Sequence, residues 1–360
     1  MTNLTYQQYV ANELDILRPV LLALGYTLAP AQKHVLGERA IIEALTTVGG
    51  RKLILEGQDA LGVPVIIKVA KEAGGQAEIN HERLCRSKIN ELAFAYDVFS
   101  VPTERHHARH GEYLINIQNF IPQEQSFLER PLADQFQFAL DAFKAQEHSR
   151  ATTSRNISSI TATFGLVDAS WYLTTLKNFL PLHATDHATH ALLTEVAQLI
   201  EAQVKTLEQY GGFLTHTDFV PHNFRIHDNK LYLLDFSAIR FGNKHESWAR
   251  FINFMTLYNP PLADLLVQYI ETNRAPEEAQ SLWLMRLIRL AELITYYRKT
   301  LPKSDGDLAT LNTARIIFWS DVLRQVLART AVPATLITNY TTLRDTLRSE
   351  DEKKRQVGLH

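Results

Sequence analysis

The strongest constraint on how this chain can fold is a change in sequence texture at Pro122. Before it, apolar runs typical of strands lie at residues 52–56, 63–70 and 113–121. Short polar or glycine-containing connections join them, which favours hairpins and therefore an antiparallel sheet. After it, apolar residues recur mainly with helical spacing. The division predicts an α+β protein with a small antiparallel-sheet lobe, a larger, mostly helical lobe and a cleft between them.

Helices are also expected in the first part of the chain, over residues 4–24 and 76–96. The polar stretch at residues 104–110 is interpreted as a connection between two strands. The later segments with helical spacing are 132–148, 187–210, 262–272, 278–300 and 308–329. Residues 213–236 break this pattern and predict a small hairpin embedded among the helices.

These patterns divide the chain into four parts. They are a helical extension over residues 1–37, a sheet lobe over 38–121, a helical lobe over 122–348 and a charged tail over 349–360. The tail is expected to be a solvated helix end or a frayed terminus.

Composition narrows the class of protein. The 360 residues are 46% hydrophobic with a formal net charge of −2, so neither nucleic acid nor a membrane surface is expected as a partner. The single cysteine, Cys85, excludes an internal disulfide and a cysteine-rich zinc site. No long apolar run and no signal-peptide pattern occurs, which favours a cytoplasmic protein. The oligomeric state is not indicated.

One polar segment carries most of the chemical information, His216-Thr-Asp-Phe-Val-Pro-His-Asn223. Asp218 opens the predicted loop, Asn223 closes it, and Asp235 ends the returning strand of the hairpin. Carboxylate and amide oxygens suit Mg²⁺, which binds few protein ligands together with substrate phosphates. A second carboxylate beside such a site can orient a hydroxyl group and accept its proton. The alternative is a polar turn with capping residues.

This segment resembles the catalytic and metal loops of the aminoglycoside phosphotransferase and choline kinase-like family, distant relatives of the protein kinases. The family pattern is His-Gly-Asp, four residues, Asn, a hairpin, and Asp before an aromatic residue. The resemblance, which covers residues 38–255, implies a bilobal protein-kinase-like fold. It also implies transfer of the γ-phosphoryl group of ATP (or GTP) to a hydroxyl of a small molecule. By this likeness Asp218 is the catalytic base, and Asn223 and Asp235 are the Mg²⁺ ligands.

The chain departs from the family pattern at three places. Thr217 replaces the usual Gly, and Ser237 stands where protein kinases have the Gly of Asp-Phe-Gly. Residues 247–250, Ser-Trp-Ala-Arg, occupy the place of an Asp-Leu-Ala-Arg-like segment, with Glu246 as the one candidate for the missing carboxylate.

The resemblance also implies a lysine in the third strand and a glutamate on the next helix. Lys68 fills the first role and would hold the nucleotide phosphates. Glu82 is the preferred partner, with Glu78 and Glu91 as alternatives on the same predicted helix. Each of these could otherwise be an ordinary surface residue.

The resemblance also implies that two further segments bind the nucleotide. The loop with Thr47, Gly49 and Gly50 is expected to cover the phosphates through exposed backbone N–H groups. Backbone groups between Gln118 and Phe120 are expected to bond the adenine ring. Adjacent glycines are otherwise most often a simple turn.

Three other functions remain open. A nucleotide-binding pseudokinase or scaffold would keep the fold without transfer. A metal-dependent hydrolase would be built around His216 and the histidine-rich segment with His183, His187 and His190. A helix would place these three on one face, and a solvated polar face is their favoured interpretation. A protein-substrate kinase is disfavoured because no Ala-Pro-Glu segment follows Asp235.

The acceptor is not identified by the sequence. A cationic acceptor would need acidic residues in the helical lobe, and the available ones are Glu201, Glu208, Asp264, Glu271 and Glu292. Antibiotic, choline-like, amino-alcohol and sugar acceptors all remain open, and antibiotic resistance does not follow from the family resemblance.

Overall fold

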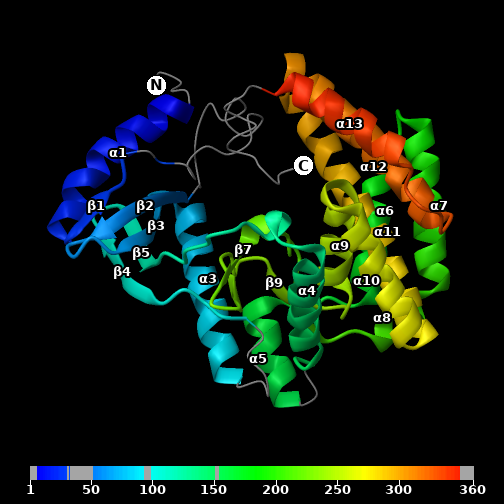
Figure 1. The fold of residues 1–360 in the computed structure, drawn as a ribbon, viewed down its shortest axis with the longest axis horizontal. Coiled ribbons are helices and arrows are strands. Elements are labelled where there is room, and N and C mark those ends of the chain that lie inside the picture. Colours follow the sequence, from blue (N-terminus) through cyan, green and yellow to red (C-terminus); the bar gives the residue numbers. More distant parts are fainter. Residues whose placement is uncertain (1–5, 31, 33–51, 93–98, 151–153, 349–360) are drawn as a thin grey trace.

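The chain folds into a sheet lobe and a larger helical lobe, which lie side by side in Figure 1. The computed structural model describes residues 6–30, 32, 52–92, 99–150 and 154–348. The predicted α+β, two-lobed class is confirmed.

The sheet lobe contains a five-stranded antiparallel sheet in the order β1-β2-β3-β5-β4. Its strands are β1 (Tyr26–Leu28), β2 (Leu53–Asp59), β3 (Pro64–Ala70), β4 (Glu104–His110) and β5 (Tyr113–Asn119). The two hairpins turn through Gly62 and Gly111, whose φ angles of +79° and +59° favour glycine.

Strand β4 corrects one expectation, because residues 104–110 form a strand and do not connect two others. They pair with β5 along its whole length and form one edge of the sheet. An edge strand is partly solvated, so it tolerates histidines and arginines. These polar residues are the reason that the sequence showed no strand pattern at residues 104–110.

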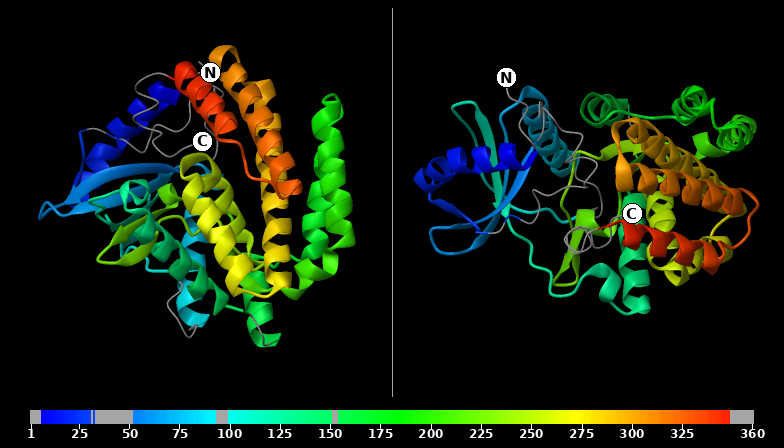
Figure 2. Two further views of the ribbon diagram at one scale, coloured as in Figure 1. Left: turned by 45° about the vertical axis from the view of Figure 1, so that its right-hand side comes forward. Right: turned by 90° about the horizontal axis from the view of Figure 1, so that it is seen from above.

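Two helices cover opposite faces of this sheet. Helix α1 (Tyr6–Ala23) buries Leu17 and Leu21 completely against the face that carries Ile67 and Ile115, and Figure 2 shows it lying across the strands. The alternate residues of β3 point the other way, toward α3 (Ala73–Leu92) and the second lobe. The N-terminal helix is therefore part of the core of the sheet lobe.

The helical lobe agrees with the predicted segments and adds further helices. Its helices are α4 (Leu132–Glu147), α5 (Ser154–Phe164), α6 (Ala169–Phe179), α7 (His187–Ala202), α8 (Val204–Gln209), α9 (Glu246–Tyr258), α10 (Pro260–Asn273), α11 (Pro276–Thr300), α12 (Gly306–Leu327) and α13 (Ala334–Leu347). Of these, α5, α6, α9 and α13 were not expected from the sequence. Helix α9 is buried from Glu246 to Leu257, although its polar residues Glu246, Arg250 and Asn253 recur with helical spacing.

Four short strands lie between α8 and α9, in the segment where the sequence predicts a hairpin. That hairpin is formed by β7 (Phe224–His227) and β8 (Lys230–Leu233). Its turn residues Asp228 and Asn229 have φ angles of 49° and 56°, as a tight two-residue turn requires. Strand β6 (Phe213–His216) pairs with β9 (Ile239–Gly242) beside it. None of the helices described here is both long and apolar enough to cross a membrane.

Candidate active site

The loop after β6 brings Asp218 and Asn223 together. A 3₁₀ turn over Pro221–Asn223 folds the chain back, and Asn223 Nδ2 then donates to Asp218 Oδ2 at 2.8 Å. On its other oxygen, Asp218 accepts from the Arg250 guanidinium of α9, with Nη2 at 2.8 Å and Nε at 2.9 Å. Both carboxylate oxygens are therefore held in place.

His216 joins this loop to the segment that carries Asp235. Its Nε2 donates to the backbone oxygen of Asp235 at 2.7 Å, and its Nδ1 accepts from the backbone N–H of Asp218 at 3.2 Å. Burial lowers the pKa of His216, so the neutral tautomer with the proton on Nε2 fits both bonds. One buried imidazole thus fixes the relative position of the two loops.

Asp235 is oriented by the residue that follows Phe236. Ser237 donates to Asp235 Oδ1 from its backbone nitrogen at 2.9 Å and from its hydroxyl at 2.7 Å. Burial alone would raise the pKa of Asp235, but Lys52, Ser237 and Lys68 outweigh it and lower the pKa. The carboxylate is therefore ionised at neutral pH.

Lys68 on β3 is buried and contacts the Oε1 atom of Glu82 on α3. Its Nζ also donates to the backbone oxygen of Leu234 at 3.1 Å, so it joins the sheet lobe to the segment before Asp235. Burial lowers the pKa of Lys68 while Glu82 opposes that shift. Of the three candidate glutamates, Glu82 is the one that contacts Lys68.

A second lysine, Lys52, is part of the same cluster and was not found from the sequence. Its Nζ lies 2.7 Å from Glu78 Oε1, 3.6 Å from Glu82 Oε2 and 3.9 Å from Asp235 Oδ1. Burial opposes its charge, but these carboxylates outweigh it and raise the pKa of Lys52. The signal in the sequence is alternation, because Lys52 and Ile54 share one face of the sheet and Ile54 pairs with Lys68.

A cavity of about 160 Å³ lies between the lobes and collects most of these groups. It is lined by residues of both lobes, including Lys52, Lys68, Gln118, Phe120, His222, Asn223, Arg225 and Asp235. Glu82 lies behind Lys68 and does not line it. The predicted residues Thr47, Gly49 and Gly50 lie outside the described part of the chain.

Gln118 and Phe120 line the cavity but already make hydrogen bonds within the sheet lobe. The Gln118 side chain accepts from Arg86 Nη1 at 2.9 Å. The Phe120 backbone N–H donates to the oxygen of Pro64 at 3.3 Å. Ile121 also lines the cavity, and its backbone N–H makes no hydrogen bond within the described part of the chain.

The departures from the family pattern have local explanations. Thr217 is not among the described residues with positive φ, so a side chain fits there, and its hydroxyl donates to the oxygen of Ala238 at 3.2 Å. Ser247 takes the place of the missing carboxylate because its Oγ accepts from the N–H of His216 at 2.8 Å. Glu246 instead contacts Arg240 and accepts from Tyr172.

The donor set of the cavity suits a magnesium ion. Asn223 uses its amide nitrogen on Asp218, which leaves its carbonyl oxygen available to a metal ion, and Asp235 supplies an ionised carboxylate in the same cavity. Two oxygen ligands leave room for substrate phosphates and water, as Mg²⁺ prefers.

The histidine-based metal site of the hydrolase alternative is not formed. No group of three or more His, Cys, Asp or Glu side chains within the described ranges could hold a metal ion. His183 belongs to a 3₁₀ turn (Leu180–His183) before α7 and is fully buried, with Nε2 3.2 Å from the Thr295 hydroxyl. It therefore shares no helix face with His187 and His190, and the interpretation of all three as one solvated face is wrong for His183.

Comparison with known proteins gives the same fold. No family model matches the sequence, and no curated protein matches it. A macrolide 2′-phosphotransferase type I superposes with a TM-score of 0.56 at 13% identity, over 88% of this chain and 99% of that one. An amicoumacin kinase in complex with AMP-PNP, Ca²⁺ and Ami gives a TM-score of 0.53 at 11% identity, over 80% and 89%.

A thermostable mutant of an aminoglycoside phosphotransferase, in a ternary complex with AMP-PNP and hygromycin B, gives a TM-score of 0.51 at 15% identity, over 78% and 92% of the two chains. The chain thus has the fold of the aminoglycoside and macrolide phosphotransferases, and the resemblance found in its motifs is confirmed at the level of the fold.

Proposed function

We propose that this protein transfers the γ-phosphoryl group of ATP or GTP to a hydroxyl group of a small molecule. The observation that carries the proposal is the convergence of Lys68, Asn223 and Asp235 on one cavity between the lobes, with Asp218 hydrogen-bonded to Asn223 beside it. A non-catalytic scaffold has no need of a positioned carboxylate at Asp218.

The nucleotide would enter between the lobes. Lys68, held by Glu82, and Lys52, held by Glu78, would place two ammonium groups on its phosphates. The adenine edge would lie along residues 118–121, where the Ile121 N–H is the best placed donor. The loop with Thr47, Gly49 and Gly50 would cover the phosphates.

Asn223 and Asp235 would hold Mg²⁺, which supplies charge neutralisation of the phosphate oxygens when bound. The low pKa of Asp235 keeps this ligand ionised. Ser237 keeps Oδ1 of the same carboxylate oriented, and His216 keeps the backbone of Asp235 against the catalytic loop.

Asp218 would receive the acceptor hydroxyl and take its proton. The hydroxyl oxygen forms the new bond to the γ-phosphorus while the bond from that phosphorus to the bridging oxygen of the leaving nucleoside diphosphate breaks. Arg250 and Asn223 hold the Asp218 carboxylate in one orientation. Because the transition state of phosphoryl transfer is loose, positioning and charge neutralisation supply most of the acceleration.

The acceptor does not follow from the structural neighbours. Their names and bound molecules refer to antibiotics, but the identities of 11–15% carry over the fold alone. The acceptor class in this proposal is accordingly a small molecule with a hydroxyl group.

The test is the thermal stability of the purified chain with ATP or GTP, with and without Mg²⁺. A ligand that binds the folded state raises the melting temperature by mass action. We expect a Mg²⁺-dependent rise that Asp235→Asn abolishes and the control Asp228→Asn, in the exposed hairpin turn, preserves. If neither nucleotide raises the melting temperature, the proposed phosphoryl transfer is refuted and the chain is a scaffold that does not bind nucleotide.

A further inference from the structure

A second cavity lies inside the helical lobe, away from the cleft between the lobes. It has a volume of about 300 Å³, and its walls come from α9, α10, α11 and the segment that joins α12 to α13. It shares no lining residue with the interlobe cavity. A cavity of this size is at the lower limit of those that hold small ligands.

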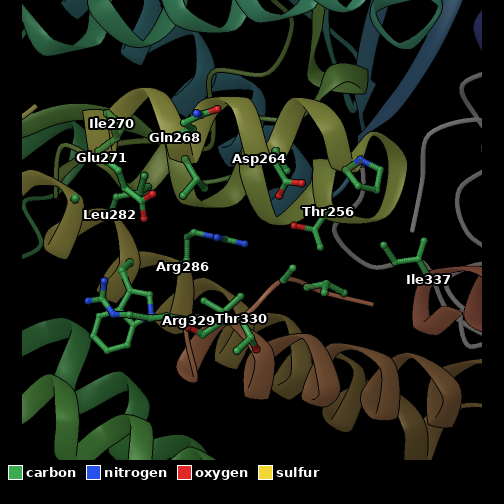
Figure 3. A pocket seen from close by; sticks show the side chains of 18 residues that line it. Thr256, Asp264, Gln268, Ile270, Glu271, Leu282, Arg286, Arg329, Thr330 and Ile337 are labelled. Atoms are coloured by element: carbon green, nitrogen blue, oxygen red, sulfur yellow. Dashed lines mark hydrogen bonds between the residues drawn. The ribbon is translucent and has the colours of Figure 1, made fainter. Parts of the chain in front are cut away.

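Arg286 on α11 extends into the centre of this cavity, as Figure 3 shows. Its Nε donates to Asn253 Oδ1 at 3.0 Å. Within the described part of the chain, no carboxylate lies at ion-pair distance from its guanidinium group. Burial lowers the pKa of Arg286 to about 10, although Asp264 and Glu271 oppose that shift. Arg286 is partly buried, and a cation that extends into a cavity without an ion-pair partner is suited to an anionic group of a ligand.

The opposite charge lies at the mouth of the cavity. Asp264, Gln268 and Glu271 share one face of α10 by their spacing and line the cavity from the exposed side. Neither carboxylate forms an ion pair among the described residues. Figure 3 shows Asp264 and Glu271 on the helix that faces Arg286.

Apolar side chains form another part of the wall. Leu282, Val326 and Ile337 line the space between α11 and the chain beyond α12. Trp283 closes one side, where its ring lies under the Arg329 guanidinium at 4.0 Å from the ring centroid. The cavity therefore combines two arginines, Arg286 and Arg329, with two carboxylates at its mouth and an apolar wall.

We propose that this cavity binds a zwitterionic small molecule with an apolar body. Its carboxylate would pair with Arg286, its apolar part would lie against Leu282 and Val326, and its ammonium group would face Asp264 and Glu271. Two carboxylates at the mouth disfavour polyanions such as nucleotides, and the inner arginine disfavours polycations. The proposal is independent of the proposed phosphoryl transfer.

The test is the melting temperature of the full chain without nucleotide, in the presence of L-leucine or L-phenylalanine as probes. Leucinamide, which keeps the ammonium group alone, and 4-methylpentanoate, which keeps the carboxylate alone, are the matched controls. At about 10 mM ligand we expect at least one amino acid to raise the melting temperature by about 2 °C or more, and each control to raise it less.

Two variants connect the effect to the cavity. Arg286→Gln removes the charge but keeps an N–H donor within reach of Asn253, so we expect an unchanged melting temperature without ligand and no rise with it. Asp264→Asn combined with Glu271→Gln changes exposed groups only and should reduce the rise. Arg324→Gln, on an exposed face of α12, is the control that should retain it.

Three results would overturn the proposal. They are the absence of a rise with both amino acids, a rise that Arg286→Gln retains, and equal rises with the singly charged controls. A strong loss of stability in Arg286→Gln would also overturn it, because the guanidinium group would then be a structural element of the fold.

Discussion

The charged side chains in and beside the interlobe cavity are each held by a specific polar partner. Lys68 is held by Glu82, and Lys52 by Glu78. Asp218 is held between Arg250 and Asn223. Such paired contacts reduce the reorganisation needed when substrate binds, which is what catalysis by positioning demands.

Replacing Asp218, the proposed base, should impair the hydrolysis of ATP without impairing the binding of ATP. Asp218→Asn should keep the Mg²⁺-dependent thermal shift with ATP, because Asp218 does not line the interlobe cavity. Basal hydrolysis of ATP to water should fall by about 10²–10⁴-fold, the usual contribution of a positioned general base. The control Asp228→Asn should hydrolyse ATP at the rate of the unsubstituted protein. Unchanged hydrolysis by Asp218→Asn would refute the assigned role.

Lys52 gives a second prediction at this scale. Lys52→Met should raise the KM for Mg-ATP by about 10-fold or more, the effect of losing a charged hydrogen bond to phosphate. Lys71→Met, which removes a half-exposed lysine paired with Glu112, is the control and should leave KM unchanged. Steady-state ATP hydrolysis measures both. An unaltered KM in Lys52→Met would mean that Lys52 serves only to hold Glu78 and Asp235.

At the scale of elements, helices of the two lobes differ in how much of their surface is buried. Helix α1 is amphipathic and covers one face of the sheet, and periodicity alone is enough to find it. Helix α9 is buried on all sides, with Trp248 stacked on Phe143 at 4.2 Å between ring centroids. Its polar residues Glu246, Arg250 and Asn253 recur with helical spacing, yet this segment was interpreted only as a departure from the family motif.

Helix α1 can be tested with two leucines that are adjacent in sequence. Leu21 is fully buried against the sheet, whereas Leu22 is 64% exposed. Leu21→Ala should lower the free energy of unfolding by about 2–5 kcal/mol, and Leu22→Ala should change it by less than about 0.5 kcal/mol. Urea denaturation measures both. Equal effects would show that α1 is not packed on the sheet as described.

At the scale of the whole molecule, the large core of the helical lobe encloses polar groups far from the cleft. His183 and His245 are both fully buried, and burial lowers the pKa of each to about 4 from a usual value near 6.5. Both are therefore neutral in the folded protein at pH 6. The unfolded chain takes up protons at these sites below about pH 6.5.

The sign of the resulting pH dependence follows from these shifts. The stability that the neutral histidines supply is complete above about pH 6.5 and is lost as the pH falls toward 4. In His183→Gln, the loss of unfolding free energy between pH 7.5 and pH 5 should be smaller by about 2 kcal/mol. His187→Gln, at an exposed position on α7, should keep the full loss. Urea denaturation at pH 7.5 and at pH 5 measures these free energies. A loss in His183→Gln equal to that of the unsubstituted protein would contradict the prediction.

The candidate site could be predicted where its residues are close together in sequence. Asp218, Asn223 and Asp235 lie within one hairpin-containing segment, and their spacing carries the chemistry. Lys52 and the cavity around Arg286 could not be found that way. Their partners are distant along the chain, so a sheet register and the packing of four helical segments must be known first.

The sequence by itself determined the division into a sheet lobe and a helical lobe, because periodicity and turn chemistry are local properties. It also determined the strands β2, β3 and β5 and the motif from His216 to Asp235. The tertiary structure decided which glutamate meets Lys68, that β4 is a strand, and that α9 crosses the core. It also brought Arg286, Asp264 and Glu271 together around one cavity. These are non-local facts, since burial and charge pairing depend on segments that only folding brings together.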